Sequence, residues 1–322
     1  MKPMDSFHPC ASNMLVKPSG TVASCRPVEP ADLQRHNHDL LTMFRLPVLI
    51  GAILFTSGLL HLLVLFVKGA DWDGPLSLRK PALFGISSGV TVWSIAWILT
   101  QFVPRRGDQR LANLLSGGLL LEVSLITLQQ WRGVSSHFNR STPVDAVIES
   151  TMLGLILLVT TGIAWLCWRT RWLRPMATSQ AIAIRAGLWL LLVSCGLGLL
   201  ITITGEMNLA KGRPPDLWGP AGVLKYPHGA VLHAVQTLPL LAFLMHKFRV
   251  RFSSGMMRSA VAAHLLFLGH ALWQTFLGRA RMDVDVTSAV LLAASGVLLL
   301  FPVVAIVHGA VARASTPRPA ST

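Results

Sequence analysis

Apolar residues in this chain come in runs long enough to cross a bilayer, separated by short polar segments. A membrane-spanning helix needs about 20 predominantly apolar residues. No alternation of period two continues through these runs, which argues against a barrel. The pattern therefore predicts an all-α, polytopic transmembrane helix bundle of about eight spans. We place these spans at residues 45–67, 81–103, 112–130, 146–168, 181–204, 227–246, 259–278 and 287–308.

The segments outside these runs are polar. Residues 1–44 carry five prolines and no apolar core followed by a cleavage site. We therefore expect a mostly disordered extension there, and no signal peptide. Residues 45–308 form one transmembrane domain in this interpretation, and residues 309–322 a short tail.

The charge of the chain is low in total but strongly basic. Charged residues make up 13% of the chain and hydrophobic residues 52%, whereas about a quarter of a soluble domain is charged. The formal net charge of +14 raises the question of a nucleic-acid partner. However, the basic residues lie in short clusters between apolar runs, with no basic face interleaved with aromatic residues. We expect topology signalling and contact with the lipid bilayer, and no nucleic-acid partner.

The distribution of Lys and Arg predicts the orientation. The N-terminal arm, the tail and the loops after spans 2, 4 and 6 together hold seventeen of these residues, and the other loops hold ten. The more basic side faces the cytoplasm in most membrane proteins. Both termini are therefore predicted to be cytoplasmic, in a bacterial cytoplasmic (inner) membrane.

Polar side chains recur in the outer half of the predicted spans, where each needs a partner or a function. Glu122 and Gln129 are seven residues apart on one helix face, and Asp145 and Glu149 share a face of the next span. A pocket between helices would explain the whole set economically; hydrogen bonds between helices are the alternative. The members are Glu122, Gln129, Asp145, Glu149, His233, Gln236 and Gln274.

The segment 129–145, which joins the third and fourth spans, adds Arg132, His137 and Asn139 as candidates for binding a ligand or a proton. Arg132 and Arg140 can pair with Asp145 or Glu149, or bind an anionic group. We prefer the simple ion pairs.

Histidines offer weaker candidates for a metal: His137, His228 and His233, with Glu122 or Glu149 beside them. His228 and His233 are five residues apart, so they diverge by about 140° on a straight helix and cannot chelate one ion there. A haem would pair His233 with His61 or His270. No motif fixes a cofactor, and its identity is left open.

Several sequence blocks resemble a family of uncharacterised bacterial multipass membrane proteins. The specific blocks are Ser-His-Phe-Asn at 136–139 and Leu-His-x-x-Gln-x-Leu-Pro at 232–239. Weaker ones lie at 80–87, 130–133 and 273–274, so the resemblance covers about 70–310 in patches. It implies the same multipass architecture and draws attention to these residues, but it implies no activity.

Three functions are open on this basis. We favour binding or transport of a small solute or ion from the outer face, with Glu122 and Glu149 carrying a proton or cation. The alternative is a membrane-embedded metal- or haem-dependent enzyme. In the third, a sensory or assembly protein, the polar residues only stabilise helix contacts. The sequence displays no broken-helix repeat of the kind that many transporters have.

Overall fold

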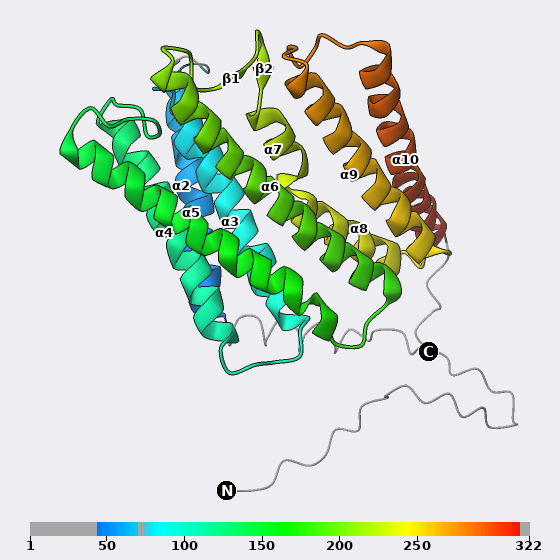
Figure 1. Cartoon of the computed structure of the whole chain (residues 1–322). Helices are drawn as coiled ribbons and strands as arrows, with labels where there is room; N and C mark the ends of the chain where they lie inside the picture. The colour runs from blue at the N-terminus through cyan, green and yellow to red at the C-terminus, as the bar shows by residue number, and fades with distance from the viewer. Residues whose placement is uncertain (1–43, 70–71, 73, 75, 316–322) are drawn as a thin grey trace, which may run out of the picture.

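The computed structural model describes residues 44–69, 72, 74 and 76–315. The extension predicted to be disordered therefore lies, apart from Phe44, outside the described residues, as does the end of the predicted tail. Within the described part, nearly every regular element is a helix, which confirms the all-α prediction (Figure 1). The α-helices are α2 (Arg45–Val67), α3 (Arg79–Thr100), α4 (Asp108–Trp131), α5 (Pro143–Arg169), α6 (Thr178–Ala210), α7 (Lys225–Leu232), α8 (Ala234–Lys247), α9 (Ser253–Phe276) and α10 (Val286–Ala314).

Seven segments of the described chain are long and apolar enough to cross a membrane. They correspond to seven of the predicted spans, with α7 and α8 together forming one segment. The remaining predicted span is α9, which is 24 residues long and runs beside α10 (Figure 1). Its two histidines, Gln274 and Arg258 make it less apolar. The count of eight spans and the cytoplasmic position of both termini stay predictions.

The start of α5 is determined by local chemistry. Thr142 is its N-cap: the hydroxyl oxygen accepts a hydrogen bond from the backbone N–H of Asp145, at 3.2 Å. Pro143 follows as the first helical residue, a position where the missing N–H costs nothing. We call the end of the bundle at which α4 ends and α5 begins the outer end, following the predicted orientation.

Glycines allow α2 and α3 to pack with their backbones almost in contact. A Cβ atom at Gly85 would lie 2.8 Å from Cα of Gly58 and 2.9 Å from the carbonyl oxygen of Leu54. Close approach through small residues is the usual way to gain dispersion energy between helices in lipid. The α2–α3 pair therefore forms a tight unit, against which α4 packs.

The predicted sixth span, at 227–246, is not one continuous helix. It is interrupted at His233, between α7 and α8. At the break, the N–H of His233 donates to the carbonyl of Val231 instead of to the residue four positions earlier. Gly187 in α6 makes room for the break, since a Cβ atom there would lie 2.9 Å from Cα of Val235. The single span predicted at 227–246 did not include this interruption.

Two short strands, β1 (Leu217–Trp218) and β2 (Gly222–Val223), form an antiparallel hairpin in the long connection between α6 and α7. Thr275 of α9 donates its hydroxyl to the carbonyl of Val223, at 3.3 Å. The hairpin lies at the outer end of the bundle, above α7 and α9 (Figure 1).

The opposite end of the bundle holds a buried ion pair. Arg169, at the end of α5, is only 1% exposed, and both of its terminal nitrogens donate to the carboxylate of Asp108 in the first turn of α4. One of them also donates to the carbonyl of Val103, at 3.1 Å. This contact joins α4 to α5, and no short sequence motif predicts it, because its two residues are 61 positions apart.

Candidate functional site

Three polar groups lie at the outer end, and the first is centred on Asp145. Its side chain is 1% exposed, and its carboxylate accepts from Gln129 at 3.0 Å, from Arg132 at 2.8 Å and from Thr142 at 2.7 Å. Arg132 also donates to the amide oxygen of Gln129. The sequence left Asp145 and Glu149 open as partners of Arg132, and the structure pairs Arg132 with Asp145. Both carboxylate oxygens of Asp145 accept hydrogen bonds, so this group fixes the loop between α4 and α5.

The second group is centred on Glu149, one turn further along α5. Its carboxylate accepts from the backbone N–H of Phe138 at 2.8 Å and from Nε of Arg140 at 3.0 Å. Arg140 also approaches Glu206 of α6, at 3.9 Å. Of the two acidic partners that the sequence left open for Arg140, the structure therefore selects Glu149. Phe138 has a left-handed backbone (φ 58°), and its ring occupies the space left open by Gly205 of α6.

The third group contains His137, whose Nδ1 lies 3.2 Å from Nζ of Lys80 and 3.1 Å from the hydroxyl of Ser136. Lys80 belongs to α3, so this contact joins the loop to another helix. Burial lowers the pKa of His137 to about 3, and the charges of Lys80 and Lys225 act in the same direction. His137 is therefore a neutral hydrogen-bond acceptor at physiological pH. Lys80 belongs to one of the resembling blocks but was not among the predicted site residues.

This depressed pKa predicts how stability depends on pH. Between pH 6.5, the ordinary pKa of histidine, and about 3, the unfolded chain binds a proton at His137 that the folded chain does not. The contribution of His137 to stability is therefore lost as the pH falls through this range. We expect the variant His137→Gln to lose less stability on acidification than the wild-type chain. The measurement is the denaturant midpoint of the detergent-purified protein between pH 7 and 4.

The matched control is His246→Gln, which removes an exposed histidine from the last turn of α8. Its pH profile should follow that of the wild type. Identical profiles for all three proteins would contradict the neutral state assigned to His137.

Glu122 differs from these groups because nothing pairs with it. It lies in the middle of α4, is 6% exposed, and has no hydrogen bond or ion pair within the described part of the chain. Cys195 of α6 is close enough to interact with it electrostatically. Gln129, which shares its helix face, is engaged with Asp145 instead.

The other buried carboxylates make the contrast clear. Asp108, Asp145 and Glu149 each have an arginine partner. An isolated ionised carboxylate is far more costly in an apolar interior than a paired one. Of the buried carboxylates that the structure describes, Glu122 alone is without a counter-charge.

The later predicted residues do not join these groups through direct contacts. Gln236 donates to the hydroxyl of Thr91 in α3, at 3.1 Å, and Gln274 donates to the carbonyl of Asp283, at 2.7 Å. The side chain of His233 is exposed at the helix break. Asn139 accepts from Ser141 in the loop. The structure thus brings Gln129, Arg132 and Asp145 together, and separately Glu149 and Arg140, but not His233, Gln236 and Gln274.

The described residues do not form a ligand cluster for a metal ion. Among the described residues, no three His, Cys, Asp or Glu side chains lie close enough together to hold a metal ion. The Nδ1 of His137 faces an ammonium group, which would repel a cation. His228 bonds to Ser194 through Nδ1, and His270 bonds to the carbonyl of Ser288. His61 accepts from Trp131, at 3.0 Å. His61, His228 and His270 thus each make a hydrogen bond to another helix.

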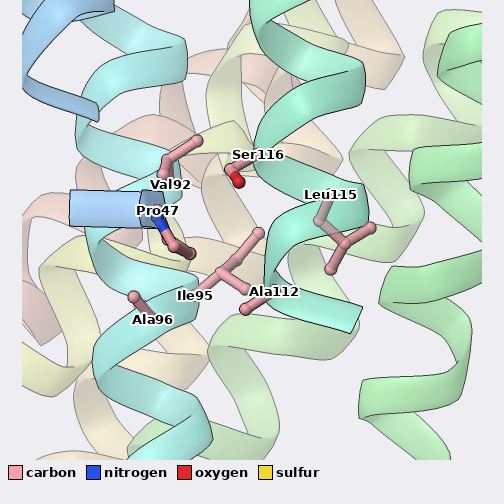
Figure 2. Close-up of a pocket in the computed structure, with 7 residues that line it drawn as sticks. All are labelled: Pro47, Val92, Ile95, Ala96, Ala112, Leu115 and Ser116. Carbon is pink, nitrogen blue, oxygen red and sulfur yellow. The ribbon is translucent and has the colours of Figure 1, made fainter. Parts of the chain in front are cut away.

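A small hollow between α2, α3 and α4 is too small for a water molecule and nearly all apolar. Figure 2 shows the side chains that line it, with the hydroxyl of Ser116 the only polar side-chain atom among them. This hollow is a packing gap and not a ligand site. It lies in the apolar core below the polar groups, since Ala112, Leu115 and Ile95 belong to the largest buried cluster.

No protein-family model, no curated protein and no solved structure matches the chain. The function proposed below therefore rests on the geometry of the site.

Proposed function

We propose that this chain is a multipass protein of a bacterial cytoplasmic membrane that binds a proton or a cation at Glu122, and that this binding accompanies the binding or transport of a small solute or ion. The apolar helices are those of an integral membrane protein. Within them, the observation that carries the proposal is the buried, unpaired carboxyl group of Glu122. Intramembrane carboxylates of this kind commonly serve as proton or ion sites.

The break between α7 and α8 supports the same proposal. Discontinuous helices are frequent in transporters, where their ends bind ions or substrates near the middle of the membrane. Counted along their helices, Glu122 and His233 lie at a similar depth, roughly 12–14 Å from the outer ends of α4 and α7. Val235, in the first turn of α8, belongs to the same buried cluster as Val123 and Cys195. A change in charge at Glu122 is therefore well placed to alter the packing of the broken helix.

The arginine-paired carboxylates have a different role in this proposal. Asp145 and Glu149 are held by three or more donors or by a cation, so they fix the loop that covers the outer end of α4 and α5. Movement of a proton through them would require these bonds to break. We therefore assign the proton- or cation-binding role to Glu122 and a positioning role to Asp145 and Glu149. Of the two carriers predicted from the sequence, Glu122 and Glu149, this proposal keeps only Glu122.

A hydrophobic carbodiimide tests the proposal, because this reagent modifies protonated carboxyl groups in apolar surroundings. The whole chain is reconstituted in lipid vesicles, treated at a series of pH values, digested and analysed by mass spectrometry. We expect Glu122 to be modified faster than Asp145 or Glu149. Raising the pH, which removes the proton from the carboxyl group, should slow the reaction, as should adding a cation that occupies the site. In parallel, vesicles holding a pH-sensitive dye should equilibrate an imposed pH gradient faster with the wild-type chain than with Glu122→Gln.

The control variant is Glu206→Gln, which removes a half-exposed carboxyl group of α6 that faces Arg140. It should leave both the modification of Glu122 and the proton movement unchanged. The proposal is overturned if Glu122 resists the reagent at every pH, or if Glu122→Gln moves protons as fast as the wild-type chain.

A further inference from the structure

The end of the bundle opposite to the outer end contains a hollow of about 680 Å³ between the α8–α9 turn and the last turns of α10. Figure 1 shows this turn beside the C-terminal part of α10. The apolar lining residues of the hollow include Phe248, Phe252 and Met256. Its other lining residues include Arg249, Arg251, His308 and Arg313.

The basic side chains of the hollow have no acidic neighbours in sequence. The chain carries no Asp or Glu between residues 217 and 282, nor after residue 285. The charges that face the hollow from the turn and from α10 are therefore all basic. Arg313 uses one nitrogen to donate to the carbonyl of Lys247, at 2.8 Å, and Arg251 lies over the ring of Phe252. The three guanidinium groups keep several donors available for an anion.

The backbone adds to this positive field. The N-cap of α9 is Phe252, which supplies no side-chain hydrogen bond to the first turn. The N–H groups at the start of a helix, together with the helix dipole, favour an anion. Arg249 and Phe252 also have left-handed backbones, with φ 55° and 54°. Residues other than glycine adopt this conformation at a cost, and such strain often occurs at ligand sites.

We propose that this hollow binds the phosphate of an anionic phospholipid headgroup. The guanidinium groups and the first turn of α9 would bind the phosphate oxygens, in the bidentate geometry that arginine prefers. Phe248, Phe252 and Met256 would contact the glycerol and the first acyl carbons. A lipid is favoured over free phosphate because the hollow has these apolar lining residues and lies at the end of membrane helices. Basic pockets at the cytoplasmic ends of membrane helices bind such headgroups in general.

Native mass spectrometry of the whole chain in a neutral detergent tests this proposal. The probes are phosphatidylglycerol, phosphatidylcholine with the same acyl chains, and inorganic phosphate. We expect the wild-type chain to retain one phosphatidylglycerol in preference to phosphatidylcholine. The variant Arg249→Gln/Arg251→Gln/Arg313→Gln should bind it on the order of 100-fold more weakly, about fivefold for each charge removed. Inorganic phosphate at the same concentration should not displace the lipid.

The matched control is Arg106→Gln/Arg110→Gln/Arg171→Gln, which removes three exposed charges from the same end of the bundle outside the hollow. It should bind phosphatidylglycerol like the wild-type chain. The single variant Arg249→Gln gives a milder test should the triple variant unfold, with an expected loss of about fivefold. Equal weakening by both triple variants, equal binding of phosphatidylcholine, or displacement by inorganic phosphate would overturn the proposal.

Discussion

Replacing Arg169 by methionine is expected to lower the free energy of unfolding by about 3–5 kcal/mol, because the Asp108 carboxylate would then be buried without a partner. Both terminal nitrogens of Arg169 donate to that carboxylate, and one also donates to Val103. Arg169 is 1% exposed, so water cannot replace these bonds without opening the end of the bundle. Methionine is unbranched and retains packing similar to that of the aliphatic part of arginine, which limits the loss of packing.

The measurement is a reversible denaturant titration of the detergent-purified chain. Arg171→Met is the control, since Arg171 is exposed and lies over the ring of Trp168, 3.7 Å from its centroid. Removing this surface contact should cost about 1 kcal/mol or less. The double variant Asp108→Asn/Arg169→Met should recover part of the loss, since it removes the uncompensated charge. Equal stability of Arg169→Met and Arg171→Met would show that the ion pair does not stabilise the fold.

Replacing Glu122 by leucine is expected to have the opposite effect and to raise the free energy of unfolding by about 1–3 kcal/mol. The carboxyl group is buried within the bundle and gains no hydrogen bond from the described residues, so it costs desolvation without compensation. Leucine has a similar volume and suits the apolar surroundings formed by Val123 and Leu119. A residue that reduces stability at a buried position is typically retained for function. The same denaturant titration measures this effect.

Asp145→Leu provides the comparison. It removes a carboxylate that accepts from Gln129, Arg132 and Thr142, and we expect it to destabilise the chain. If Glu122→Leu destabilised the chain to the same extent, Glu122 would have a structural partner. The proposal of a proton or cation site would then fail in favour of a sensory or assembly protein with structural polar contacts.

The positions of the helices could be predicted from the sequence because each apolar run has the length of a membrane crossing. Local chemistry also explains the start of α5, where Thr142 and Pro143 form a cap that needs no tertiary contact. The ion pairs Arg132–Asp145 and Arg140–Glu149 were predictable for the same reason, since both join residues within or beside one short loop.

The sequence could not predict which face of each helix points toward lipid and which points toward the protein interior. Lipid tails are as apolar as leucine, so a membrane helix is apolar on both its lipid-facing and its protein-facing sides. Periodicity therefore did not show that His233 is exposed, nor that Gln236 and Gln274 bond to different parts of the chain. The break at His233 is accommodated by Gly187, a residue of another helix.

The sequence alone determined a multipass helical protein with carboxylates in its spans, because length, composition and local caps are properties of short segments. Only the tertiary structure decided which of these carboxylates are paired. Asp108 pairs with Arg169, which lies 61 residues away in the sequence, whereas Glu122 has no counter-charge among the described residues. Whether a buried charge has a partner depends on how helices distant in sequence rotate and pack, and that arrangement separates a structural carboxylate from a candidate proton or cation site.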